Sequence, residues 1–118
     1  MNLDKLIEMQ RELDNKIREE KGLQDADLVA NTYVALQVEL AEFANEARWF
    51  KYWSEDQEPR GQAEYLEYRC TCEGGNRWVN KNPLLEEYVD SLHFFLSLAI
   101  QKGWEKQLYV YEEAILDL

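Results

Sequence analysis

Apolar residues recur at helical spacing in three long stretches of the chain, and residues that begin or end helices flank each stretch. The expected helices cover residues 3–21, 26–50 and 83–102. The flanking signals are Asn2 and Gly22 for the first, Asp25 for the second, and Asn82-Pro83 and Gly103 for the third. The second stretch contains neither Gly nor Pro, so nothing in it predicts a break before Phe50.

Residues 54–82 break the helical period and contain Pro59 and three glycines. A short hairpin about Gly74-Gly75-Asn76 and a helical turn near residues 65–68 are both compatible with this segment. Residues 105–118 return to helical spacing. The pattern predicts an all-α fold and a single domain of residues 1–118, with an irregular or hairpin insert at about 54–82.

Two polar residues, Gln10 and Asp14, interrupt the apolar stripe of the first helix. They are four residues apart, so they lie on one helix face. One interpretation is a helix that is half-exposed at this point. The other is a pair of side chains that point together into a polar pocket within the core.

Two pairs of acids stand among apolar residues: Glu39 and Glu42 in the second helix, and Glu87 and Asp90 in the third. A spacing of three places both members of a pair on one helix face. The acids either form a solvated face or meet across two helices. Buried acids repel each other unless a cation compensates their charge, so the second arrangement predicts a divalent cation site.

Such a site suits phosphate chemistry. Mg²⁺ takes oxygen ligands and commonly binds a few carboxylates together with substrate phosphates. Phosphoryl transfer needs positioning and charge stabilisation rather than a nucleophilic side chain, and the sequence shows no Ser/His/Asp or Cys/His constellation. A ferritin-like di-iron site would need Glu-x-x-His pairs, and only His93, three residues after Asp90, leaves it open.

The formal net charge of −11 in 118 residues argues against a nucleic-acid partner, because phosphate binders need a basic face. No apolar run approaches the roughly 18 residues that span a bilayer, so no membrane partner is expected. The first residues lack the features of a signal peptide, and Cys70 and Cys72 are too close in sequence for a favourable mutual disulfide. These features predict a cytoplasmic protein.

Three motifs together resemble the all-α dUTPases, the dimeric type related to the MazG-like nucleotide pyrophosphatases. The likeness covers roughly residues 3–53 and 83–104. The motifs are Gln10-x-x-Leu13-Asp14-x-x-Ile17, then Glu39-Leu-Ala-Glu42 leading to Trp49-Phe-Lys51-Tyr-Trp53, then Glu86-Glu87-Tyr-Val-Asp90-x-Leu-His93-Phe94.

The resemblance implies a bundle of four to five helices. It also implies a homodimer or higher assembly that cleaves dUTP, with Mg²⁺, to the monophosphate and pyrophosphate. It implies metal ligation by Glu39, Glu42, Glu87 and Asp90, one of which would also orient the attacking water. Gln10 and Asp14 would face the base. The other expected substrate contacts are Trp49 or Phe94 to base or sugar, Lys51 to phosphate, and Arg77 from the insert.

The chain departs from the family pattern at Asp14, where Asn is common. An Asp accepts hydrogen bonds where an Asn also donates, so selectivity for uracil is less strongly implied. Two other functions therefore stand beside dUTP hydrolysis. One is a MazG-like pyrophosphatase for dCTP or a modified nucleotide, and the other is a non-catalytic acidic helical oligomerisation module.

Overall fold

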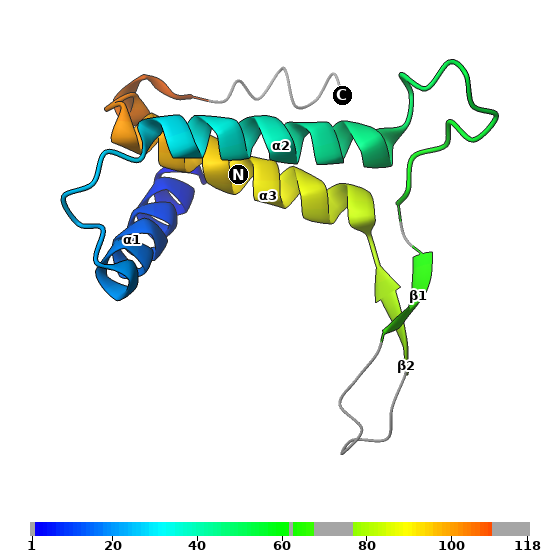
Figure 1. Cartoon of the computed structure of the whole chain (residues 1–118), viewed down its shortest axis with the longest axis horizontal. Helices are drawn as coiled ribbons and strands as arrows, with labels where there is room; N and C mark the ends of the chain where they lie inside the picture. The colour runs from blue at the N-terminus through cyan, green and yellow to red at the C-terminus, as the bar shows by residue number, and fades with distance from the viewer. Residues whose placement is uncertain (1, 62, 68–76, 110–118) are drawn as a thin grey trace. The chain divides into compact units, whose positions relative to one another are not determined.

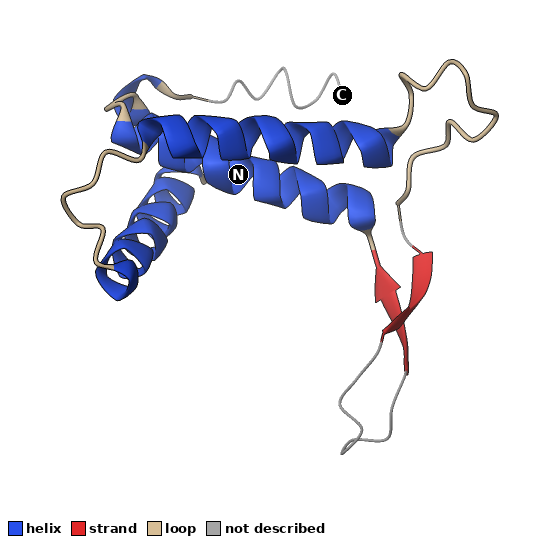
Figure 2. Ribbon diagram, in the orientation of Figure 1, coloured by secondary structure: helices blue, strands red, loops and turns tan. Residues whose placement is uncertain are grey.

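The computed structural model of the protein describes residues 2–61, 63–67 and 77–109, in the two strands mainly their backbone (Figure 1). Helices dominate these residues, as the sequence predicts, and the remainder is loop with one pair of short strands (Figure 2). The elements are α1 (Leu3–Lys21), α2 (Val29–Ala47), β1 (Ala63–Glu67), β2 (Arg77–Lys81), α3 (Pro83–Gln101) and the 3₁₀ helix η2 (Glu105–Gln107).

The ends of α1 and the start of α3 follow their local sequence signals. The Asn2 side chain accepts a hydrogen bond from the Lys5 backbone N–H at 3.1 Å, and Gly22 ends α1 with a φ of 67°. At α3, the Asn82 side chain accepts from the Leu85 N–H at 3.0 Å, and Pro83 is the first helical residue. These helix boundaries are confirmed.

The boundaries of α2 differ from those expected. The helix begins at Val29, after the Asp27 carboxylate accepts a hydrogen bond from the Val29 N–H at 3.1 Å. It ends at Ala47 rather than Phe50, because Arg48 takes a left-handed conformation with a φ of 64°. A non-glycine residue rarely adopts this conformation without stabilising contacts, and those of Arg48 are described below.

The insert contains the hairpin strands, not the helical turn that the sequence also allowed. β1 and β2 pair antiparallel with Tyr65 opposite Val79. The expected turn at Gly74-Gly75-Asn76 lies outside the described residues. In the C-terminal stretch, Glu105–Gln107 form one 3₁₀ turn, and the helix expected over the rest of this stretch also lies outside the described residues beyond residue 109.

The chain divides into two compact units, the first made of Met1–Leu36 and Leu92–Leu118, the second of Gln37–Ser91. In the first unit, Ile7 of α1 and Leu96 and Ala99 of α3 are buried. The Gln101 amide nitrogen donates to the Thr32 hydroxyl at 2.8 Å, so α2 and α3 are in contact here. The expectation of one domain stays a prediction.

In the second unit, the peptide groups of Arg60 join the facing ends of two helices. The Arg60 N–H donates to the Glu46 carbonyl at 2.9 Å, and the Arg60 carbonyl accepts from the Leu84 N–H at 3.0 Å. Both bonds satisfy backbone groups that a helix end leaves unpaired. The rings of Phe43 and Tyr88, with centroids 6.0 Å apart, pack between the same helices. The end of α2 therefore lies beside the start of α3, and the two run antiparallel in this unit.

Many large apolar side chains of these helices remain exposed in the single chain. On α2 they include Tyr33, Val34, Val38 and Leu40, and on α3 Leu85, Tyr88, Val89 and Phe95. Contiguous apolar patches, where they are large, mark protein–protein contact surfaces. The helices that the structure describes include none with the length and apolarity that a membrane span requires.

Candidate functional site

Three of the four acids singled out in the sequence come together in the second unit. Carboxylate oxygens of Glu39 and Glu42 on α2 and of Glu87 on α3 all lie within 4.8 Å of one another. We call these three residues the acid cluster. Glu39 and Glu87 are half-buried, and Glu42 is exposed. The antiparallel pairing of α2 and α3 brings the acids together, because the spacing of three keeps Glu39 and Glu42 on one face of α2.

Asp90, the fourth acid, is exposed and stands apart from this group of three. Its charge nevertheless raises the pKa of both Glu39 and Glu87, so it lies near them. It also lines a surface hollow of about 410 Å³ together with Leu85, Glu86 and Val89. Asp90 therefore adds negative charge near the acid cluster. Its side chain also lies at the wall of this hollow.

Among the described residues, no cation forms an ion pair with the acid cluster. Burial, with the hydrogen bond and charge of neighbouring Glu42, raises the pKa of Glu87 from 4.5 to about 7. Burial and the charges of Glu42 and Asp90 also raise the pKa of Glu39. One oxygen of each, Oε2, is buried without a hydrogen-bond partner among the described residues. Buried anionic oxygens without donors are costly, so the cluster is more favourable with a bound proton or a bound cation.

The donor set fits a hard divalent cation. All the grouped atoms are carboxylate oxygens, which Mg²⁺ and Mn²⁺ prefer, and the group contains no His or Cys of the kind that selects Zn²⁺. The orphaned Oε2 atoms of Glu39 and Glu87 offer free ligand positions for such an ion. Magnesium is therefore chemically compatible with the acid cluster as it stands.

Gln10 and Asp14 contact each other in the first unit. The Gln10 amide nitrogen donates to the Asp14 carboxylate at 2.8 Å, and Gln10 is only 5% exposed. The Gln10 amide oxygen lies 2.6 Å from Nδ1 of His93 on α3. The sequence indicated His93 as a possible iron ligand and as part of a family motif, but not as a partner of Gln10. Its place between Leu92 and Phe94 on α3 was the signal that could have indicated a polar partner.

Trp49 and Lys51 lie on the loop that follows α2. Trp49 is 75% exposed, and its ring meets Phe50 edge-on with centroids 6.2 Å apart. The Lys51 ammonium lies 6.0 Å from the centroid of the Phe50 ring, within cation–π range. Tyr52 and Trp53 of the same loop are also exposed, so residues 49–53 present four exposed aromatic side chains and the Lys51 ammonium.

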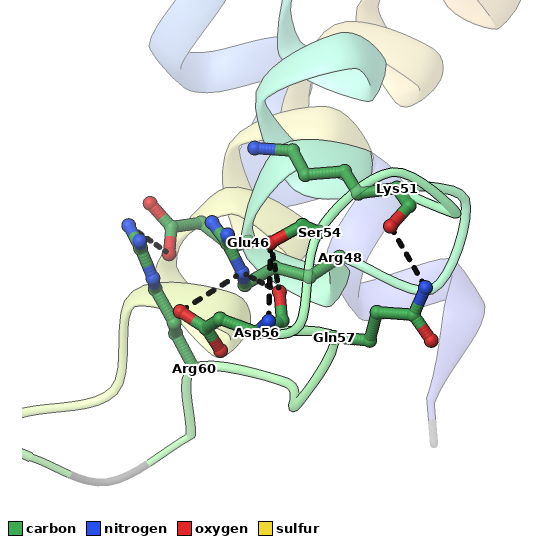
Figure 3. Close-up of polar contacts among 7 residues, drawn as sticks. All are labelled: Glu46, Arg48, Lys51, Ser54, Asp56, Gln57 and Arg60. Atoms are coloured by element: carbon green, nitrogen blue, oxygen red, sulfur yellow. Dashed lines mark hydrogen bonds and ion pairs between the residues drawn. The ribbon is translucent and has the colours of Figure 1, made fainter.

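Arg48 fixes this loop, as Figure 3 shows. Its buried guanidinium donates to the Asp56 carbonyl at 2.8 Å and lies 3.4 Å from the Asp56 carboxylate. The Gln57 amide nitrogen also donates to the Lys51 carbonyl at 2.7 Å, a second contact within the same loop. No local sequence signal indicated the contact between Arg48 and Asp56.

The two remaining residues expected to contact the substrate are Phe94 and Arg77. Phe94 is half-buried on α3 in the first unit. Arg77 is the first residue of β2, and its side chain lies outside the described residues. Neither is therefore assigned contacts at either cluster.

Comparison with protein-family models yields a match. The model is described as dUTPase, and it matches residues 2–69. The matched segment contains α1, α2 and the loop after α2, with Glu39, Glu42, Gln10 and Asp14 among its residues. No curated protein and no solved structure matches the chain.

Proposed function

This chain belongs to the all-α dUTPase family, and from that premise we propose that it hydrolyses dUTP, with Mg²⁺, to dUMP and pyrophosphate. One water is added across the bond between the α and β phosphates, and pyrophosphate leaves. The acid cluster is the observation that carries this proposal. Three carboxylates gathered without an ion-paired cation among the described residues supply the oxygen ligands with which a divalent ion binds beside a triphosphate.

In this proposal Glu39, Glu42 and Glu87 would hold Mg²⁺, and Asp90 would be a fourth ligand. Bound there, Mg²⁺ would neutralise charge on the triphosphate and favour deprotonation of the attacking water. The protein would contribute fixed oxygens on two paired helices, one of which orients the water. Because α2 and α3 are held together by the Arg60 peptide and the Phe43–Tyr88 contact, these oxygens need little reorganisation before reaction.

The other residues would bind the nucleotide. Gln10 and Asp14 would recognise the base, and their mutual hydrogen bond supports a pre-arranged polar surface for it. Lys51 would meet a phosphate, and Trp49 or Phe94 would pack on base or sugar, with Arg77 as a further cation. The exposed Trp49 ring and the tethered loop that carries it support a stacking role.

We also propose that the active form is a homodimer or a higher assembly. The exposed apolar residues of α2 and α3 support this, since Val34 and Val38, and likewise Leu85 and Val89, repeat at four-residue spacing on their helices. A second copy of the chain would remove this surface from water. Light scattering checks the claim, and a stable monomer at micromolar concentration would contradict it.

The decisive experiment is a panel of the four canonical deoxynucleoside triphosphates and dUTP, each with Mg²⁺, with pyrophosphate release as the readout. We expect dUTP to give the highest kcat/KM and EDTA to abolish turnover. Activity confined to dCTP or to a modified nucleotide would replace the substrate and keep the mechanism. No hydrolysis of any nucleotide would leave the non-catalytic oligomerisation module as the better description.

A further inference from the structure

Three side chains of the first unit form a continuous chain of hydrogen bonds. Asp14 accepts from the Gln10 amide nitrogen at 2.8 Å, and the Gln10 amide oxygen lies 2.6 Å from Nδ1 of His93. Gln10, in the middle, is 5% exposed, whereas the His93 ring is exposed. Solvent can therefore exchange with the ring but scarcely with the amide that holds it.

The Asp14 carboxylate determines which group donates in each hydrogen bond of this series. An ionised carboxylate only accepts hydrogen bonds, so Gln10 must turn its NH₂ group towards Asp14. The amide oxygen then faces His93, and an oxygen of this kind also only accepts. The hydrogen on the short contact must consequently belong to His93, at Nδ1.

A neutral imidazole with its hydrogen on Nδ1 has a free lone pair on Nε2. We propose that Asp14, acting through Gln10, holds His93 as the Nδ1–H tautomer, so that Nε2 of this exposed residue accepts a hydrogen bond from an N–H of the substrate base. This inference rests on the proposed function, which brings a pyrimidine base to Gln10 and Asp14. His93 is then a specificity-determining residue, and Asp14 is a positioning residue.

The tautomer selects between pyrimidines. The N3 atom of uracil carries a hydrogen, which Nε2 can accept. The N3 atom of cytosine carries a lone pair, which would face the lone pair of Nε2 and leave both unsatisfied. With Asn at position 14 the Gln10 amide could turn over, because Asn both donates and accepts. Asp14 therefore strengthens the selection of uracil, contrary to the expectation from sequence alone.

The sequence offers a clean test, because His93 is its one histidine. Long-range ¹H–¹⁵N spectra of untagged, ¹⁵N-labelled protein report the protonation of each ring nitrogen. At a pH where the same spectra show a neutral ring, we expect Nδ1 to carry the hydrogen and Nε2 to have the shift of an unprotonated nitrogen. In Asp14→Asn we expect averaged shifts of a tautomer mixture. Glu12→Gln, which removes an exposed carboxylate from the same helix, should match the parent protein.

The base contact is tested by adding α,β-imido-dUTP with Mg²⁺. The Nε2 resonance should move in the direction of hydrogen-bond acceptance while Nδ1 changes little, and α,β-imido-dCTP should leave both nearly unchanged. In Asp14→Asn the preference in kcat/KM for dUTP over dCTP should fall about tenfold, mainly through KM for dUTP.

A neutral ring with its hydrogen on Nε2 in the parent protein would overturn the inference, and so would an unchanged tautomer in Asp14→Asn. An Nε2 resonance that ignores the dUTP analogue would overturn the contact with the base. The tautomer measurement uses free protein and needs no turnover. Failure of the proposed function would appear instead as absent pyrophosphate release, so the two failures are distinguishable.

Discussion

Two regions of the second unit surround a half-buried glutamate with opposite charges. Glu46, at the end of α2, has a cation of its own chain, since its Oε2 lies 3.8 Å from the Arg60 guanidinium. That distance gives an ion pair but is too long for a hydrogen bond. Glu39, two helical turns earlier, faces Glu42 and Glu87 instead. Both glutamates are half-buried, so burial alone does not distinguish them.

The difference indicates where an external cation belongs. Around Glu46 and Arg48, acids and bases from α2 and its following loop pair with each other (Figure 3). At the acid cluster the described residues supply only further negative charge, and the pKa of Glu87 rises accordingly to about 7. Charge pairing thus stabilises the first region, whereas under the proposed function the second region gives up stability for metal binding.

The largest effect is expected from neutralising a single acid of the proposed metal site. Glu42→Gln or Asp90→Asn should lower kcat/KM for dUTP by more than about 100-fold, because loss of even an outer-shell partner of a metal ligand costs 10- to 100-fold. The fold should be intact by circular dichroism. If both variants release pyrophosphate as fast as the parent protein, the assignment of these acids is wrong.

The Arg48 contacts should dominate the stability of the compensated region. Arg48→Ala loses a charged hydrogen bond to the Asp56 carbonyl and should destabilise the protein by about 2 kcal/mol. Arg48→Gly loses the same bond but relieves the left-handed backbone, so it should be more stable than the Ala variant by about 1 kcal/mol. Urea unfolding measures both. A Gly variant less stable than the Ala variant would contradict the backbone argument.

Without metal, the acid cluster should make stability fall as pH rises. Folding raises the pKa of Glu87 from 4.5 to about 7, so the folded state binds more protons between these values. The Glu87 contribution is therefore unfavourable above pH 7 and disappears towards pH 4.5. In EDTA, Glu87→Gln should have the higher Tm at pH 7.5 and a flatter pH profile. Identical profiles for variant and parent protein would show that Glu87 is not perturbed.

The smallest effect is expected at Glu46. Its partner Arg60 is 44% exposed, and ion pairs of this kind contribute about 0–1 kcal/mol. Glu46→Gln should therefore change the free energy of unfolding by less than about 1 kcal/mol and leave kcat/KM within about twofold. A loss of activity as large as that of Glu42→Gln would mean that Glu46 belongs to the metal site.

Local signals account for much of the fold. Several helix ends depend on contacts between residues close in sequence, and these ends are predicted correctly. They are the ends marked by Asn2, Gly22 and Asn82-Pro83. The end of α2 was mispredicted because it depends on Arg48 reaching Asp56, eight residues away, with no Gly or Pro to indicate it. Among the described residues, local sequence is informative where the stabilising contact is itself local.

The two polar clusters differ in the same way. Glu39 and Glu42 were recognisable because an i, i+3 pair of acids is anomalous among apolar neighbours, and pairing with a second such pair is a simple expectation. The contact between Gln10 and His93 joins residues 83 positions apart. No rule of sequence spacing relates Gln10 to His93, so the tautomer of His93 could be inferred only from the three-dimensional structure.

Binding of Mn²⁺, measured by the loss of its free electron paramagnetic resonance signal, tests the central claim most directly. Mn²⁺ takes the same oxygen ligands as Mg²⁺. The parent protein and Glu46→Gln should remove Mn²⁺ from solution equally well, and Glu39→Gln should bind it at least tenfold more weakly. Equal binding by all three proteins, or a loss confined to Glu46→Gln, would contradict the assignment of the acid cluster as the metal site.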